Sequence, residues 1–109
     1  MTNTSRLLTI IADNAIEEAH DIRNYFAHGE ITFEMANETL LSLRKMLRGV
    51  RDDLDYNGIP DEADTIRTAL REIRDIRDLI YEYKAKIELY EINLRKELRE
   101  QIKAEQWRI

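Results

Sequence analysis

The C-terminal part of the chain, from residue 61 to residue 109, contains neither glycine nor proline. Along it, apolar residues recur at alternating steps of three and four positions, the heptad pattern of a helix that turns one face towards a neighbouring helix. These residues are Ile66, Ala69, Ile73, Ile76, Ile80, Tyr83, Ile87, Tyr90 and Leu94. We therefore predict one uninterrupted helix over residues 62–106. At 1.5 Å per residue it would be about 67 Å long, which exceeds the dimensions of a compact domain of this chain length.

Two shorter helices are expected before this segment. The first spans residues 5–28 and ends at Gly29, and its apolar stripe consists of Leu8, Ile11, Ala15, Ala19, Ile22 and Phe26. The second spans residues 33–56 with Thr32 as its N-cap, and its stripe consists of Phe33, Ala36, Leu40, Leu43, Leu47, Val50 and Leu54. The short link between them favours an antiparallel hairpin.

A second break, at Gly58 and Pro60, separates the hairpin from the long helix, and Asp61 is the expected cap of that helix. The predicted fold class is all-α: an antiparallel helical hairpin followed by one long helix, forming a three-helix bundle with a coiled-coil-like C-terminal extension. Residues 1–109 form a single helical domain in this interpretation. The composition agrees, because 36% of the residues are charged and glycine and proline are scarce.

Composition excludes several classes of protein. The chain has no cysteine, so disulfides, thiolate metal sites and a thiol nucleophile are excluded. No apolar run approaches the ~20 residues of a membrane-spanning helix, and no secretory signal pattern opens the sequence. We therefore expect a cytoplasmic protein with no membrane partner. Because basic and acidic residues are mixed near the C-terminus, direct binding of nucleic acid is not expected.

The long helix predicts self-association. Each of the two shorter helices has about 24 residues, so together they cover only about half of the long helix. The other half still carries many apolar residues, and such a surface is unusual on a monomer. We expect a second copy of the chain to cover it in a dimer or a higher oligomer. The expected interface residues are Ile80, Tyr83, Ile87, Tyr90, Leu94, Leu98 and Ile102.

Residues 23–28 read R-N-Y-F-A-H, and this R-N-x-x-x-H pattern resembles the signature of HEPN domains. Those are all-helical, often dimeric, metal-independent ribonucleases. The resemblance implies that Arg23 and His28 of two protomers face one RNA phosphate, with His28 as acid or base and Arg23 stabilising the charge of the transition state. The alternative is structural: a solvated Arg23 and a His28 placed favourably at the C-terminus of a helix, next to Gly29.

The turn before the long helix resembles a cation-binding loop in its spacing. The oxygen-bearing residues there match the EF-hand pattern, with Gly58 at the sharp turn, and they are Asp53, Asp55, Asn57, Asp61 and Asp64. The short Asp64 and the lack of a sister loop lead us to expect at most weak Ca²⁺ or Mg²⁺ binding and no required cofactor. The alternative assigns these residues to ending one helix and starting the next.

The same turn is a candidate docking surface for a basic protein, because six acidic and no basic residues lie between positions 52 and 66. The expected docking residues are Asp52, Asp53, Asp55, Asp61, Glu62 and Asp64.

A single E-x-x-H step, Glu17 to His20, resembles the paired motifs of carboxylate-bridged metal bundles. It occurs once, on a charged helix face, so a solvated face is the simpler interpretation.

The favoured interpretation is a non-catalytic, homo-oligomeric helical interaction protein, such as a small acidic inhibitor or adaptor that binds another protein. The first alternative is a HEPN-like ribonuclease that uses Arg23 and His28. The second alternative is a helix-loop-helix protein that binds a divalent cation weakly. Convergence of Arg23 and His28 on one cleft would favour the ribonuclease. Loop oxygens that surround one point would favour the cation-binding protein.

Overall fold

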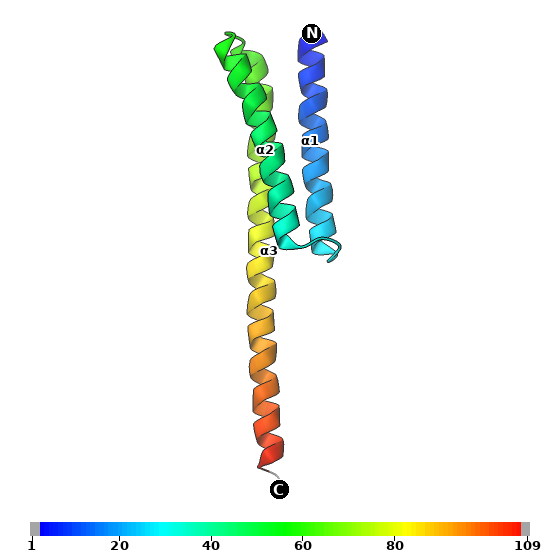
Figure 1. Ribbon diagram of the computed structural model, residues 1–109, viewed down its shortest axis with the longest axis vertical. Coiled ribbons are helices and arrows are strands. Elements are labelled where there is room, and N and C mark those ends of the chain that lie inside the picture. Colours follow the sequence, from blue (N-terminus) through cyan, green and yellow to red (C-terminus); the bar gives the residue numbers. More distant parts are fainter. Residues whose placement is uncertain (1–2, 108–109) are drawn as a thin grey trace.

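The computed structural model describes residues 3–107, with side chains described from residue 5 onward. It contains three helices: α1 (Asn3–Ala27), α2 (Phe33–Tyr56) and α3 (Pro60–Gln106) (Figure 1). Residues 3–107 include no strand. The prediction of an all-α protein is therefore confirmed. None of the described helices combines the length and the apolar character needed to cross a membrane.

The molecule is a rod. Its principal extents are 80 × 21 × 17 Å and its radius of gyration is 21.3 Å, whereas a compact chain of this length has a radius of gyration of about 13 Å. Figure 1 shows α1 and α2 lying along the N-terminal half of α3, with α2 antiparallel to both of the other helices. The C-terminal half of α3 extends beyond them without a neighbouring helix.

One hydrophobic core joins the three helices, and it ends at Ile80 of α3. The residues contributed by α1 are Leu8, Ala12, Ala15, Ala19 and Ile22, those of α2 are Ala36, Leu40, Leu43, Leu47 and Leu54, and those of α3 are Ala63, Ile66, Ala69, Ile73, Ile76 and Ile80. The many alanines let the helix backbones approach closely. We call α1, α2 and α3 up to Ile80 the three-helix part.

The stripe expected on the first helix was wrong at one position. Ile11 is 38% exposed, and Ala12 is buried in its place. Ile11 lies three positions and Ala12 four positions after Leu8, and both spacings keep a residue on the same face of a helix. The spacing therefore does not predict which of the two is buried. The packing of α1 against its neighbours selects the small residue for the core and leaves the larger one near solvent.

The turns between the helices follow the local chemistry of their residues. Gly29 and Gly58 adopt φ values of +73° and +72°, the left-handed conformation that glycine takes without strain. Thr32 is the N-cap of α2, as predicted, and its hydroxyl oxygen accepts a hydrogen bond from the backbone N–H of Met35 at 3.1 Å. The expected cap of α3 was wrong: the helix starts at Pro60, its N-cap is Ile59, and Asp61 lies in the first turn.

The capping role of Thr32 leads to a stability prediction. Thr32→Ala removes the side-chain oxygen that caps the start of α2 and is expected to lower the free energy of unfolding by about 1 kcal/mol. Thr39→Ala is the matched control, because the exposed hydroxyl of Thr39 donates only to the carbonyl of Met35 inside the same helix. Urea unfolding followed by circular dichroism should show a loss for Thr32→Ala alone. Equal losses in both variants would contradict the capping role.

Candidate functional site

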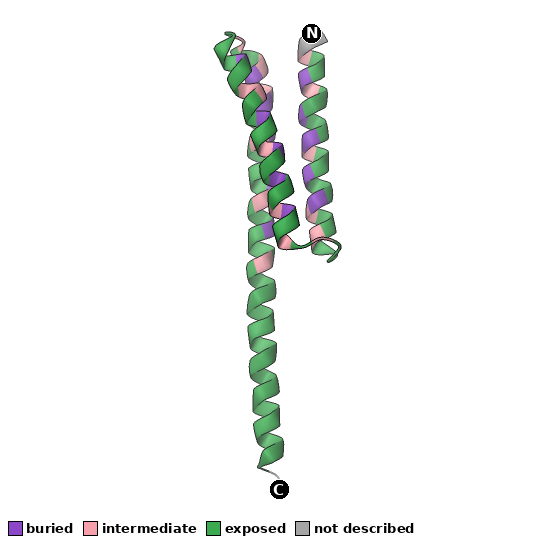
Figure 2. Cartoon of the chain, in the orientation of Figure 1, coloured by how far each residue is buried: buried purple, intermediate pink, exposed green. Residues whose placement is uncertain are grey.

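The C-terminal half of α3 presents an uncovered apolar face. From Tyr81 to Trp107, every residue except Lys84 is exposed, and Figure 2 shows the C-terminal part of α3 in green beyond its last pink band. The predicted interface residues within it keep between 40% and 75% of their surface accessible: Ile87, Tyr90, Leu94, Leu98 and Ile102. We call residues 84–106 the α3 tail. No element of the described chain packs on its apolar face.

An aromatic cluster closes the core where the α3 tail begins. The ring of Phe26 lies 6.2 Å from that of Phe33 and 6.0 Å from that of Tyr83, and Phe33 lies 5.0 Å from Tyr81, all edge to face. The Tyr81 hydroxyl also donates to the side-chain oxygen of Asn37 at 3.2 Å. These contacts bind α3 to the ends of α1 and α2, so that the edge of the three-helix part is well defined.

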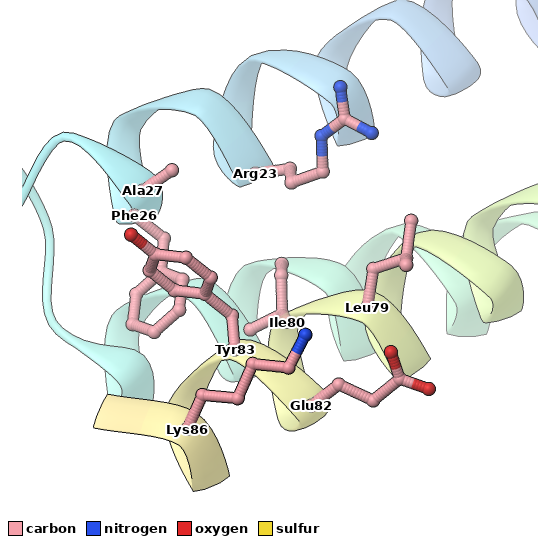
Figure 3. A pocket seen from close by; sticks show the side chains of 8 residues that line it. All are labelled: Arg23, Phe26, Ala27, Leu79, Ile80, Glu82, Tyr83 and Lys86. Atoms are coloured by element: carbon pink, nitrogen blue, oxygen red, sulfur yellow. The ribbon is translucent and has the colours of Figure 1, made fainter. Parts of the chain in front are cut away.

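Two of the predicted interface residues have contacts inside the chain. Ile80 is only 2% exposed and belongs to the core, so it has almost no free surface to offer to an oligomer interface. Tyr83 contacts Phe26 with one edge but stays 44% exposed. Beside it lies a pocket of about 230 Å³ between the end of α1 and α3 (Figure 3). Its lining residues are Arg23, Phe26, Ala27, Leu79, Ile80, Glu82, Tyr83 and Lys86.

The two residues of the HEPN-like pattern have different surroundings. Arg23 lies on α1 and lines the pocket beside Tyr83, as Figure 3 shows. His28 is exposed in the turn after α1, and its Nδ1 donates to the carbonyl oxygen of Asn24 at 2.7 Å. This is a local bond at the end of a helix, the structural alternative to a catalytic role. Within one chain the pocket includes the arginine but not the histidine.

The acidic turn does not form a twelve-residue cation loop. Residues 53–56 belong to α2 and residues 60–64 belong to α3, so only Asn57, Gly58 and Ile59 connect the two helices. The Asn57 amide nitrogen donates to the carbonyl of Asp53. Among the described residues, including Glu17 and His20, no group of three or more histidines and carboxylates is arranged to hold a metal ion.

Most of the proposed acidic docking residues already have partners inside the chain. The Arg67 guanidinium forms ion pairs with the carboxylates of Asp55 and Asp64, with nitrogen–oxygen distances of 2.6 and 2.7 Å. Arg51 forms an ion pair with Asp52, with a nitrogen–oxygen distance of 2.9 Å. The Glu62 carboxylate accepts a hydrogen bond from the Ser5 hydroxyl at 3.0 Å. The remaining carboxylates of this set, on Asp53 and Asp61, have no ion pair among the described residues. The turn therefore offers fewer unpaired carboxylates to a basic partner than its sequence indicates.

A groove lined by arginines, which the sequence analysis did not find, lies between α2 and α3. Its volume is about 280 Å³, and we call it the arginine groove. Besides Leu70, its lining residues are Arg44, Arg48 and Arg51 of α2 and Arg67, Arg71 and Arg74 of α3. The signal in the sequence was the repetition of arginine at helical spacing beside both apolar stripes. Because α2 and α3 are antiparallel, the two rows face each other.

The arginines of this groove are incompletely neutralised. Arg44, Arg48 and Arg71 have no hydrogen bond or ion pair within the described part of the chain. Burial lowers the pKa of Arg44, and the positive charges of Arg48, Arg77 and Arg74 lower it further, against a smaller opposing effect of Asp78. By contrast, the hydrogen bonds that Arg67 donates to the carboxylates of Asp64 and Asp55 raise the pKa of Arg67 at one end of the groove.

Comparisons with known proteins do not assign the chain to a family. No protein-family model, no curated protein and no solved structure matches it. Two surfaces of this structure remain as candidates for function: the apolar face of the α3 tail and the arginine groove.

Proposed function

We propose that this chain is a non-enzymatic helical interaction protein that forms a homodimer through the α3 tail. The observation that carries the proposal is the apolar stripe of the tail, whose exposed residues are Ile87, Tyr90, Leu94, Leu98 and Ile102. A monomer rarely exposes such a surface, and a two-fold dimer is the commonest way for identical chains to cover one. In this proposal the three-helix part is a bundle and the tail is its coiled-coil-like extension.

The length of the tail favours an antiparallel dimer. The core ends at Ile80 of α3, Tyr81 and Tyr83 make the last ring contacts with Phe33 and Phe26, and α3 stops at Gln106. A partner α3 covers the length from Ile80 to Gln106 when its own Gln106 lies level with Ile80 and the two-fold axis passes near Asn93. In that register, apolar residues of the two α3 helices meet within one or two positions: Tyr83 with Ile102, Ile87 with Leu98, and Tyr90 with Leu94.

The charges that flank the stripe fit the same register. Glu91 of each chain comes level with Arg95 of the partner subunit, so the dimer contains two pairs of opposite charge at this level. The one other pair of charged residues that comes level between Ile80 and Gln106, Lys86 with Glu100, is also of opposite sign. In a parallel dimer each residue would instead be level with its own copy, so like charges would share a level. Complementary flanking charges are a determinant of helix orientation in coiled coils.

The dimer also bears on the alternatives. It separates the two three-helix parts, because Ile80 of one chain lies about 40 Å from Ile80 of the other along the paired tails. Two pairs of Arg23 and His28 would then be too far apart to act on one phosphate, so this dimer does not support the HEPN-like ribonuclease. In an adaptor or inhibitor role, the rod would offer one three-helix part at each end to a protein partner.

A charge exchange tests the proposal. Light scattering after gel filtration is expected to give the wild-type chain a mass of twice 13.0 kDa. Glu91→Arg places two like-charged pairs in the antiparallel dimer and should weaken it roughly tenfold, because each exposed pair contributes about 0.2–1 kcal/mol. The double variant Glu91→Arg with Arg95→Glu restores opposite charges and should recover the dimer.

The same experiment has clear contrary outcomes. A monomeric wild-type chain at micromolar concentration would contradict the proposed function. A wild-type dimer that the double variant fails to recover would contradict the antiparallel register. Raising the ionic strength should shrink the difference between the variants, since these charges are solvent-exposed.

A further inference from the structure

We propose that the arginine groove binds a small ligand with two or more adjacent phosphate groups, of the pyrophosphate or tripolyphosphate class. Six arginines line a space of about 280 Å³, close to the lower end of the volumes of small-molecule sites. Guanidinium groups pair with phosphate oxygens through two parallel hydrogen bonds. The site lies on the three-helix part and is independent of the dimer contact in the α3 tail.

An unsatisfied donor on a groove-lining arginine supports this assignment. The Nε–H group of Arg44 is buried and has no acceptor within the described chain, and the same holds for Arg77, which lies outside the groove lining. A buried donor without an acceptor is costly to the folded protein. The Arg77 guanidinium lies 5.1 Å from the centre of the Tyr81 ring, a cation–π contact within α3. A phosphate anion in the groove would supply the acceptor that Arg44 lacks.

Like charges on the two facing helices also support it, because Arg44 and Arg48 of α2 and Arg74 of α3 line one groove. Arg48, Arg74 and Arg77 all act on Arg44 by electrostatic repulsion, and Asp78 opposes this effect. Natural sequences seldom place cations opposite one another along a helix seam without a compensating anion, because opposite charges at such positions stabilise the pairing. We infer that the ligand provides the missing negative charge and stabilises the three-helix part when it binds.

The shape of the charged region favours a compact ligand over a nucleic acid. Carboxylates border the groove at both ends: Asp55 and Asp64 beside Arg67, and Asp78 near Arg44. A longer polyanion that passed through the groove would meet these negative charges on the way in and on the way out. A short polyphosphate would contact the central arginines, Arg48 and Arg71, without reaching either end.

Isothermal titration of the full-length chain with sodium tripolyphosphate tests the proposal. Saturable binding of one ligand per chain is expected, and it should weaken as the ionic strength rises. Arg48→Gln and Arg71→Gln should each weaken binding at least about tenfold, because each removes a charge-assisted pair of hydrogen bonds. Arg6→Gln is the matched control, since it changes the net charge equally at an exposed position of α1 outside the groove.

Arg44→Met adds a readout that does not depend on the ligand. Removing the repelled cation should raise the melting temperature of the free protein while weakening tripolyphosphate binding.

Absence of saturable binding, or an Arg6→Gln variant that loses as much affinity as Arg48→Gln, would overturn the proposal. A lower melting temperature with unchanged binding in Arg44→Met would do the same. An RNA oligonucleotide that binds the groove more tightly than tripolyphosphate would overturn the assignment to a small ligand.

Discussion

Ile73→Ala is expected to lower the free energy of unfolding by about 2–5 kcal/mol. Ile73 is fully buried and lies in the middle of the α3 segment that contributes to the core. The substitution removes three carbon atoms from a closely packed site and leaves a cavity that the surrounding helices fill only in part. Since small domains are stable by about 5–15 kcal/mol in total, this is a large fraction. Urea unfolding followed by circular dichroism measures it.

Ile87→Ala is the matched control on the same helix. Ile87 follows the same heptad spacing but is 40% exposed, because α1 and α2 end before it. The same substitution should therefore have little effect on the unfolding of a monomer and should instead weaken the dimer. Its effect should grow with protein concentration, since dimerisation stabilises the folded chain by mass action. A loss as large as that of Ile73→Ala and independent of concentration would contradict the division of α3 into a covered and an uncovered half.

Leu94→Asp is expected to convert the dimer into a monomer. In the antiparallel register, Leu94 lies near the two-fold axis, where each chain would bury the new carboxylate against Tyr90 of the partner subunit. Burying an unpaired charge costs several kcal/mol, so the dissociation constant should rise more than about a hundredfold. The helices of the three-helix part should stay folded, because Leu94 contributes nothing to their core. Light scattering after gel filtration and circular dichroism together separate dissociation from unfolding.

Ile92→Asp is the control for the face of the helix. Two residues apart on a helix, Ile92 and Leu94 point in directions about 160° apart, and both are exposed in the single chain. The proposed dimer leaves Ile92 in solvent, so Ile92→Asp should remain dimeric. Dissociation of both variants, or of neither, would contradict an interface on the Leu94 face.

Trp107 provides a second readout of the same dimer. It is the single tryptophan of the chain, and it is 87% exposed at the end of α3. The antiparallel register brings it level with Leu79 of the partner subunit, at the edge of the three-helix part. Its fluorescence should therefore be shifted to shorter wavelength in the wild-type dimer than in Leu94→Asp. Identical emission spectra in the two would place Trp107 away from the partner.

Much of the fold was accessible from local patterns. The left-handed conformations of Gly29 and Gly58 and the cap at Thr32 each depend on a few neighbouring residues, so the sequence predicts them directly. The start of α3 was predicted two residues too late, because Pro60 was interpreted as a break whereas it occupies the first helical position, which proline fits well. The choice between Ile11 and Ala12 depended on the neighbouring helices and was not available from spacing.

The candidate sites were less accessible, because they combine residues from different helices. Arg67 neutralises Asp55, twelve positions earlier in the chain, and so changes the charge of the acidic turn in a way that a count of residues does not reveal. The arginine groove was missed for the same reason. Arg44 and Arg74 are thirty positions apart in sequence, and each belongs to a helix face whose residue pattern, considered alone, is that of ordinary solvated surface.

The sequence by itself determined that this protein is all-helical and where its turns fall, because helix periodicity and glycine conformation are local properties. Only the tertiary structure decided which parts of those helices meet. Ile73 and Ile87 satisfy one and the same apolar pattern, yet the first is buried and the second is exposed, since burial depends on where α1 and α2 end. The facing rows of arginine likewise exist only because α2 and α3 run antiparallel, a relation between distant segments that no single stretch of sequence contains.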